Sequence, residues 1–234
     1  MNTPGQTRTL AVDIGGSGIK AIVLDEADKP LTERGRVDTP EPATPRAVIR
    51  AIVALAKKQR EFDRVSVGFP GVVRSGVTET AHNLHPAWKG FGFAKALSKS
   101  LGKPVRVGND ADVQGFGVIT GRGVELVITL GTGFGSALFI DGKLAPNLEL
   151  GHHPFRGGKT YEEILGSSAL KKAGKKKWNR RLRTAIQQLE ALFNYDSLLI
   201  GGGNAKKIVG VLPANVKTVP NVAGLLGGIA LWRD

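Results

Sequence analysis

DIGGSGIK, residues 13–20, decides the fold prediction because it connects two apolar segments that both favour β-structure. Residues 9–12 precede the turn and residues 19–24 follow it, so the pattern predicts a strand, a tight turn and a second strand. Glycines permit positive φ and, without Cβ atoms, let backbone N–H groups approach a phosphate closely. Walker loops and dinucleotide fingerprints run from a strand into a helix, so neither fits this context. Taken alone, the stretch is equally compatible with an ordinary glycine hairpin.

A second glycine loop, LGTGFGS at residues 130–136, has the same organisation. Residues 124–130 predict an apolar strand before it, and residues 136–140 predict another strand after it. Thr132 offers a phosphate both a hydroxyl and an N–H group. Two similar hairpins far apart in the chain predict two related lobes, each with one phosphate loop.

The composition is that of a compact protein with an unusual charge. The 234 residues can bury one good core or two modest ones, and the absence of cysteine excludes disulfides and thiolate metal sites. No apolar stretch approaches the ~20 residues of a membrane span, and residues 1–9 lack the apolar region of a signal peptide. We therefore expect a cytoplasmic protein without a membrane partner.

The net charge of +13 indicates an anionic partner. The densest basic run covers residues 171–183 and includes Lys175, Lys176, Lys177 and Arg180. This run is interpreted either as a solvated helix face or as a binding track for a long anion.

The remaining pattern predicts an α/β protein. In the first half we expect strands at 8–13, 19–25, 31–37, 64–69 and 105–108, and helices at 45–60, 91–101 and 110–120. In the second half we expect further strands at 124–130, 136–140 and 197–200, and helices at 161–172, 178–193 and 222–232. Trp178, Leu182, Ile186, Leu189 and Phe193 form an apolar stripe that indicates core packing. The predicted lobes are residues 1–107, with a C-terminal helix at about 220–234 packing back on them, and residues 108–219.

Several polar residues are suited to a polyhydroxylated ligand. Asn109 and Asp110 follow a predicted strand end, where open α/β sheets bind their ligands. Glu149 and His152 would share a face of a helical turn, and Glu162 follows them. Taken locally, a structural role explains His152 better than sugar binding does, and a zinc site lacks a third ligand at suitable spacing.

These motifs together resemble the ROK family of sugar kinases: DIGGSGIK, GNDAD at 108–112, LGTGFG at 130–135 and ELGH at 149–152. Within it, the chain is similar to polyphosphate glucokinases at GFPGVV (68–73), GKKKWNRR (174–181) and GGGNA (201–205). The resemblance spans nearly the whole chain. It implies a two-lobed actin-like, ribonuclease-H-like fold with a cleft between the lobes.

The resemblance also implies that Mg²⁺-dependent phosphoryl transfer from polyphosphate, with ATP as a second candidate donor, converts glucose to glucose 6-phosphate. Asp110 matches the catalytic base. The implied sugar ligands are Asn83, Asn109, Asp110, Glu149, His152 and Glu162. The implied phosphate loops comprise Asp13, Gly15, Gly16, Ser17, Gly18, Lys20, Thr132 and Gly133. The donor-binding candidates are Gly201, Gly202, Gly203, Asn204, Lys175, Lys176, Lys177 and Arg180.

Three alternatives remain at this stage: a strictly ATP-dependent glucokinase, a kinase for another hexose, and a sugar-responsive regulator without activity. Regulators of the family carry an N-terminal helix-turn-helix module, whereas here the first strand begins near residue 9, so we expect no nucleic-acid partner. Many relatives have a cysteine-rich zinc motif after Gly-His, but residues 154–160 contain no cysteine. The family resemblance also favours a homodimer.

Overall fold

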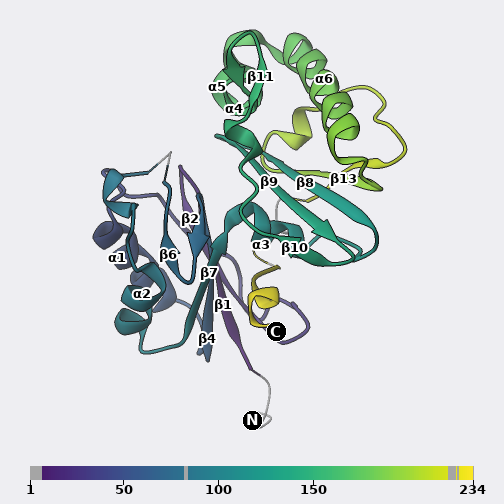
Figure 1. Ribbon diagram of the computed structural model, residues 1–234. Helices are drawn as coiled ribbons and strands as arrows, with labels where there is room; N and C mark the ends of the chain where they lie inside the picture. The colour runs from purple at the N-terminus through teal and green to yellow at the C-terminus, as the bar shows by residue number, and fades with distance from the viewer. Residues whose placement is uncertain (1–6, 82–83, 221–224, 226, 234) are drawn as a thin grey trace. The chain divides into compact units, whose positions relative to one another are not determined.

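The computed structural model describes residues 7–81, 84–220, 225 and 227–233. The chain divides into two compact units (Figure 1). The first comprises Met1–Gly117 with Val222–Asp234, and the second comprises Val118–Asn221. In the described part of the chain, no helix combines the length and apolar character needed to cross a membrane.

The first unit is built on a five-stranded sheet in the order β3-β2-β1-β4-β7. Its strands are β1 Thr9–Ile14, β2 Ile19–Leu24, β3 Gly35–Val37, β4 Arg64–Phe69 and β7 Val105–Asn109. The β1–β2 and β2–β3 pairs are antiparallel, whereas β1, β4 and β7 run parallel to one another. A small ribbon of β5 Val73–Arg74 and β6 Val77–Thr78 precedes the short helix η1 Pro86–Trp88.

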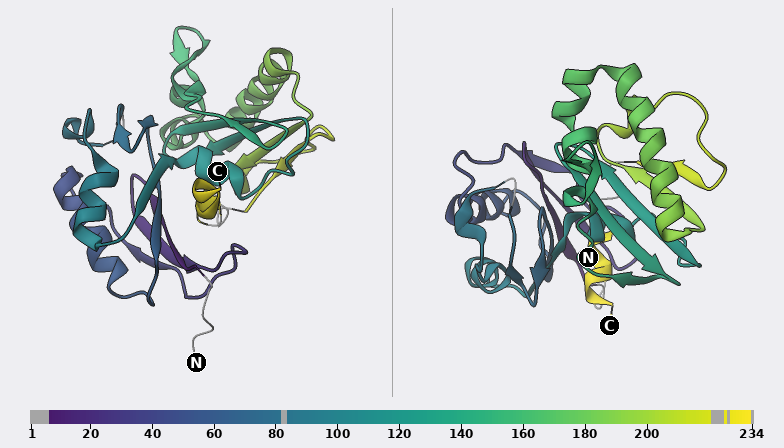
Figure 2. Two further views of the ribbon diagram at one scale, coloured as in Figure 1. Left: turned by 60° about the horizontal axis from the view of Figure 1, so that its bottom comes forward. Right: turned by 45° about the horizontal axis from the view of Figure 1, so that its top comes forward.

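Both faces of this sheet are covered. Successive side chains of a strand point to opposite faces, and in β1 the apolar residues on both faces are buried. Leu10, Val12 and Ile14 pack with residues of helices α1 Pro45–Ala56 and α2 Phe93–Leu101. The intervening Ala11 packs with Ile229 of the C-terminal helix η4 Gly227–Trp232. Figures 1 and 2 show η4 on the side of the sheet opposite α1 and α2. Helix α3 Asp110–Phe116 packs between β4, β7 and η4.

The C-terminal segment is fixed to the first sheet by a tryptophan between two arginines. The guanidinium carbons of Arg64 and Arg106 lie 4.9 and 4.7 Å from the ring centroid of Trp232. The indole N–H donates to Ser66 Oγ at 2.8 Å, and Arg106 Nη1 donates to the carbonyl of Leu231 at 2.6 Å. Cation–π contacts and hydrogen bonds therefore join β4, β7 and η4.

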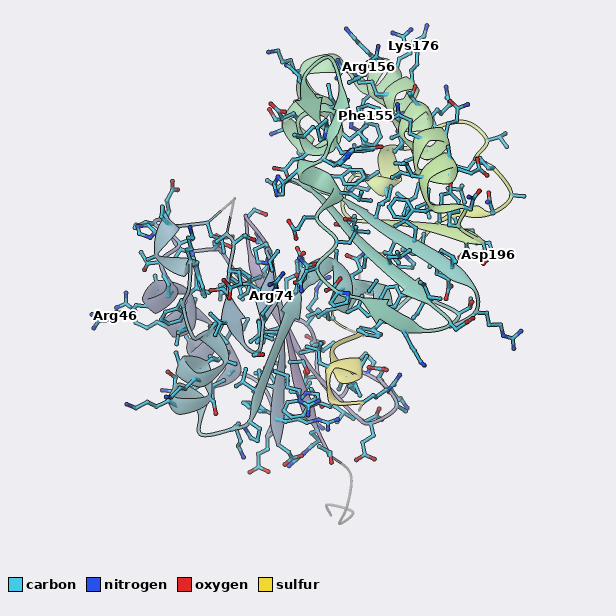
Figure 3. The ribbon with its side chains drawn as sticks, viewed as in Figure 1. Arg46, Arg74, Phe155, Arg156, Lys176 and Asp196 are labelled. Atoms are coloured by element: carbon cyan, nitrogen blue, oxygen red, sulfur yellow. The ribbon has the colours of Figure 1, made fainter. Side chains whose placement is uncertain are left out.

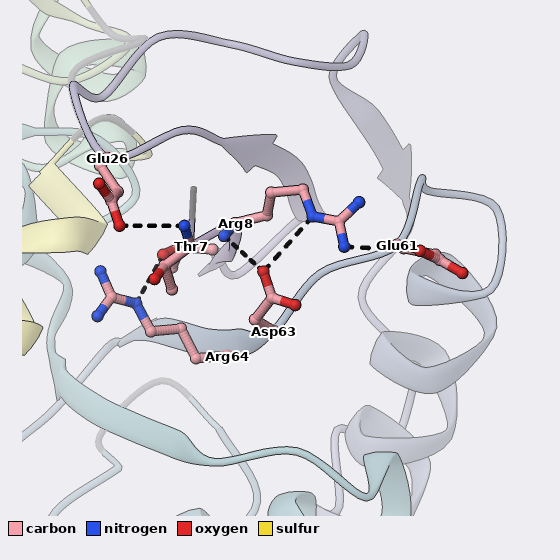
Figure 4. A network of polar contacts seen from close by, with 7 residues as sticks. Thr7, Arg8, Glu26, Glu61, Asp63 and Arg64 are labelled. Atoms are coloured by element: carbon pink, nitrogen blue, oxygen red, sulfur yellow. Dashed lines mark hydrogen bonds and ion pairs between the residues drawn. The ribbon is translucent and has the colours of Figure 1, made fainter. Parts of the chain in front are cut away.

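One of these arginines belongs to a polar network at the start of β1 (Figure 4). Arg64 Nε donates to Thr9 Oγ1 at 2.9 Å, which orients its guanidinium. The backbone N–H of Arg8 donates to Asp63 Oδ2 at 2.7 Å, and this bond lowers the pKa of the Asp63 carboxyl. The side chain of Arg8 also pairs with Asp63 and with Glu61.

The second unit repeats the strand order of the first. Its sheet runs β10-β9-β8-β13-β14, with β8 Val124–Leu130, β9 Phe134–Ile140, β10 Lys143–Ala145, β13 Ser197–Gly201 and β14 Val216–Thr218. Again the first three strands form antiparallel pairs, and β8, β13 and β14 are parallel. The predicted relation between two lobes is therefore confirmed at the level of topology.

Helices and short elements cover one face of the second sheet (Figure 2). They are η2 Leu150–His152, β11 Pro154–Arg156, β12 Lys159–Thr160, α4 Tyr161–Leu165, α5 Ser167–Ala173, α6 Lys175–Phe193 and η3 Ala205–Lys207. The predicted stripe on α6 is confirmed, since Trp178, Leu182, Ile186 and Leu189 are buried and Phe193 packs against the same core.

Several predicted boundaries differ from the structure. The helix predicted at 161–172 is broken at Gly166, whose backbone is extended, and a Cβ there would lie 2.8 Å from the carbonyl of Thr132. Helix α6 begins at Lys175, so the basic run opens this helix. Strand β3 is shorter than residues 31–37. Near the C-terminus η4 is a 3₁₀ helix, and residues 221–224 and 226 lie outside the described part. Helix α3 belongs to the first unit, whereas the boundary predicted after residue 107 precedes it.

Replacing Trp232 tests the attachment of the C-terminal segment. Trp232→Ala is expected to lower the free energy of unfolding by about 2 kcal/mol, because a half-buried ring and two cation–π contacts are lost. Urea denaturation followed by circular dichroism measures this change. Leu192→Ala, at a 62% exposed position on α6, is the control and should cost less than about 0.5 kcal/mol. Equal effects of the two substitutions would contradict this role of Trp232.

Candidate active site

The first glycine loop is a tight turn between β1 and β2. Gly15 N donates to the carbonyl of Gly18 at 3.0 Å, which closes the turn. Neither glycine has a positive φ, so at Gly15 it is the close approach of the Gly18 carbonyl, and not a left-handed backbone, that favours glycine. A Cβ on Gly15 would lie 3.1 Å from the Gly18 carbonyl, and one on Gly18 would lie 2.7 Å from Arg36 Nε. Thr39 Oγ1 holds the loop by donating to the Gly15 carbonyl at 2.6 Å.

Charged side chains adjoin this loop. Lys20 Nζ donates to Asp13 Oδ2 at 2.8 Å, and the two side chains are 24% and 21% exposed. Arg36 Nη2 donates to the carbonyl of Ser17 at 3.0 Å and pairs with Asp38. The sequence-based set includes Asp13, Ser17 and Lys20 but omits Arg36. Only the sheet register, which pairs Arg36 with Lys20, reveals this arginine.

Asp110 is the first residue of α3, directly after β7. It is half-buried, and its Oδ1 accepts from Ala111 N at 2.8 Å. A Cβ on Gly68, in the neighbouring β4, would lie 3.4 Å from the Asp110 Cα, so β4 packs directly against the start of α3. Since β1 and β7 both run parallel to β4, Asp110 and the first loop lie at the same edge of the sheet.

Asn109 shapes the turn that presents Asp110. Its buried side chain caps α3, with Oδ1 accepting from Ala111 N at 2.8 Å and Asp112 N at 3.2 Å. Its Nδ2 donates to the carbonyl of Gly71 at 3.2 Å. These bonds give Asn109 a structural role that the sequence did not predict, while direct sugar binding by Asn109 stays a prediction. Asn83, another predicted sugar ligand, lies outside the described residues.

In the second unit, the loop between β8 and β9 is fixed through the carbonyl of Gly131. This oxygen accepts from Ser167 Oγ at 2.6 Å, Ser167 N at 2.9 Å and Asn204 Nδ2 at 3.1 Å. Asn204 Nδ2 also donates to Ser167 Oγ at 3.0 Å. The structure thus brings the predicted Asn204 to the predicted loop of Thr132 and Gly133. Ser167, which sequence reasoning missed as a site residue, joins them.

The segment 201–203 approaches the same loop from β13. Gly202 has φ +85, a conformation that L-residues rarely adopt, and a Cβ there would lie 2.6 Å from Leu130 N. Asn204 N donates to the Leu130 carbonyl at 2.8 Å. The predicted donor-binding residues Gly201, Gly202, Gly203 and Asn204 therefore lie beside the end of β8.

The acidic sugar candidates also gather near this loop. Glu162, on α4, accepts from Phe134 N at 3.2 Å through its Oε2. Glu149 and His152 lie at the two ends of one 3₁₀ turn, with Glu149 Oε2 3.5 Å from His152 Nε2. This turn packs against α4 and β9. The prediction that Glu149 and His152 share one face is confirmed.

From Lys175 onward, the basic run forms the exposed beginning of α6 (Figure 3, where Lys176 is labelled). Lys175, Lys176, Lys177 and Arg180 are all exposed. Inside the same turns, buried Asn179 donates to the carbonyls of Lys175 at 2.9 Å and Lys207 at 3.1 Å. The side chain of Asn179 therefore links the start of α6 to η3, which follows the Gly201–Asn204 segment in the chain. Positive side chains at a helix N-terminus oppose its macrodipole, so an anion bound there would relieve repulsion.

Asn204→Ala tests the support of the second loop. Loss of the bonds to Gly131 and Ser167 is expected to lower the free energy of unfolding by about 1–2 kcal/mol. Faster hydrogen exchange of the backbone amides at residues 131–134 should accompany this loss. Asn215→Ala, elsewhere in the second unit, is the control. Unchanged exchange in Asn204→Ala would show that Asn204 does not hold the loop.

The chain is similar to known proteins over most of its length. The model of the ROK family matches residues 9–162. A polyphosphate glucokinase of Mycobacterium tuberculosis is 34% identical, over 96% of this chain and 92% of its own length. The crystal structure of an inorganic polyphosphate/ATP-glucomannokinase from Arthrobacter sp. strain KM is 34% identical, with a TM-score of 0.88, and covers 97% of this chain and 100% of its own.

A ROK family glucokinase from Streptomyces griseus shares the fold at 22% identity, with a TM-score of 0.80 over 97% of this chain and 99% of its own. These likenesses confirm the predicted α/β, actin-like fold. The matched motifs run from the first glycine loop through Asp110 and the second loop to Glu162. This protein therefore belongs to the ROK family.

Proposed function

We propose that this protein transfers the terminal phosphoryl group of inorganic polyphosphate to the 6-hydroxyl of glucose, forming glucose 6-phosphate. The observation that carries the proposal is the position of Asp110 at the sheet edge that also bears the first glycine loop. A carboxylate and a phosphate-binding turn at one edge suit phosphoryl transfer to an alcohol. The similarity to a mycobacterial polyphosphate glucokinase supports this choice of donor and acceptor.

Asp110 acts as the base in this proposal. Phosphoryl transfer passes through a loose transition state in which the attacking hydroxyl loses its proton late. Asp110 therefore orients the 6-hydroxyl through a hydrogen bond and receives its proton as the new P–O bond forms. A positioned base of this kind contributes roughly 10²–10⁴ in rate.

Glucose would be held by Glu149, His152 and Glu162. Sugar hydroxyls both donate and accept hydrogen bonds, so carboxylates and an imidazole can bind several of them. Glu149 Oε2 lies 3.5 Å from His152 Nε2, and this contact orients both side chains before the sugar binds. Asn109 contributes by capping α3 and presenting Asp110.

In each unit, the backbone N–H groups of the glycine loop suit binding of a phosphate, and in the second unit Thr132 adds a hydroxyl. Mg²⁺ suits this chemistry, since kinase sites combine one or two carboxylates with water and substrate phosphates. Asp13, on β1 next to the first glycine loop, is the carboxylate that would hold Mg²⁺ through a bound water. No group of three or more His, Cys, Asp or Glu arranged for a metal occurs among the described residues, so we expect the donor to supply the other oxygen ligands. When bound, Mg²⁺ neutralises phosphate charge.

The donor proposal depends on the basic beginning of α6. Polyphosphate requires a series of cations, which Lys175, Lys176, Lys177 and Arg180 provide on an exposed surface. ATP is a second candidate donor, supported by the Gly201–Asn204 segment and by the name of the Arthrobacter enzyme. We also expect the protein to form a homodimer, as the family resemblance in the sequence implies.

Asp110→Asn tests the base. Turnover should fall by about 10²–10⁴ because the amide cannot accept the proton, while glucose binding persists. Steady-state kinetics and titration calorimetry with glucose measure the two effects. Glu61→Gln changes an exposed carboxylate of the same unit and should leave turnover unaltered. Equal turnover of Asp110→Asn and the parent protein would exclude Asp110 as the base.

A donor assay with polyphosphate and ATP, each at two salt concentrations, tests the donor. Activity with polyphosphate should fall more steeply with salt, because several exposed charges contact one polyanion. Combined replacement of Lys175, Lys176 and Lys177 by glutamine should raise KM for polyphosphate by about tenfold. The same change at Lys57, Lys58 and Lys103, exposed on the first unit, is the matched control. If the protein phosphorylates glucose with ATP but not with polyphosphate, the polyphosphate proposal is overturned.

A further inference from the structure

We propose that Arg36, on β3, binds a phosphate of the donor beside the first glycine loop and thereby contributes to donor affinity. This inference rests on the proposed phosphoryl transfer and extends the phosphate site to a strand outside the glycine motif. Its basis is the position of the guanidinium in the first unit.

The sheet register places three charged residues in one row next to the loop. Asp13 on β1 is opposite Lys20 on β2, and Lys20 is opposite Arg36 on β3. Side chains opposite one another across a sheet have Cβ atoms about 4.5–5.5 Å apart, and like charges in such positions destabilise the pairing. Lys20 is drawn toward Asp13, with 2.8 Å between Nζ and Oδ2. A phosphate beside Lys20 and Arg36 would relieve the remaining repulsion.

The guanidinium of Arg36 lies directly on the glycine loop. Its Nη2 donates to the Ser17 carbonyl at 3.0 Å. A Cβ on Gly18 would lie 2.7 Å from Nε and 2.9 Å from Nη2, so the guanidinium rests against the backbone of Gly18. The loop that offers backbone N–H groups therefore also holds a cation with five N–H donors.

The present partner of Arg36 is easily exchanged. Arg36 Nη2 is 3.0 Å from Asp38 Oδ1, and the two side chains are 53% and 85% exposed. Exposed ion pairs contribute little to stability, whereas the planar guanidinium binds phosphate oxygens in pairs. A donor phosphate can thus replace Asp38 while the bond to Ser17 keeps the guanidinium on the loop.

The test compares Arg36→Gln with Arg34→Gln. Both remove one exposed positive charge, but position 34 precedes β3 and lies outside the charged row. Loss of a charge-assisted hydrogen bond should weaken binding of inorganic polyphosphate about tenfold or more in Arg36→Gln, measured by titration calorimetry without glucose. KM for polyphosphate should rise in parallel while KM for glucose stays constant. Arg36→Lys should restore part of the affinity.

The results separate this inference from the proposed function. If Arg36→Gln and Arg34→Gln bind polyphosphate equally, while the parent protein phosphorylates glucose, Arg36 does not contact the donor and only this inference fails. If KM for glucose rises as much as KM for polyphosphate, the effect is structural and the inference is also overturned. If the parent protein neither binds polyphosphate nor uses it, the proposed function itself fails.

Discussion

Parallel pairing of β1, β4 and β7 is the constraint on which the rest of the first unit depends. Parallel strands end at the same sheet edge, so the glycine loop after β1 and the aspartate after β7 are brought to one edge although about a hundred residues separate them. At this edge a Cβ on Gly68 would be in van der Waals contact with the Cα of Asp110, and the guanidinium of Arg36 lies against Gly18.

The aspartate is presented by a helix that is fixed from several sides. Asn109 caps α3 and donates to the Gly71 carbonyl, while the C-terminal η4 packs against α3 and both neighbouring strands. Trp232 attaches η4 through two arginines on those strands. The last described residues of the chain therefore help to fix the helix that bears Asp110. A short helix has little stability of its own, so tertiary contacts must position it.

The second unit has the same strand order as the first, but different contacts hold its glycine loop. One carbonyl, that of Gly131, accepts from Ser167 and Asn204, which come from α5 and from the segment after β13. Asn179 then links that segment to the basic start of α6. Repeated topology thus gives each unit a loop at the end of its first long strand, whereas the side chains around the loop differ between the units.

The sequence by itself determined the strand–loop–strand hairpins, the position of Asp110 after a strand and the buried stripe of α6. Each of these depends on local periodicity and on glycines next to strands, which act over a few residues. Only the tertiary structure decided that Gly166 breaks a helix, that Asn109 is a cap with a distant partner, and that Arg36 lies opposite Lys20. These features depend on strand register and on backbone approaches between segments remote in the chain. Local pattern does not encode such distances, because they arise only when the sheets and the helices that cover them pack together.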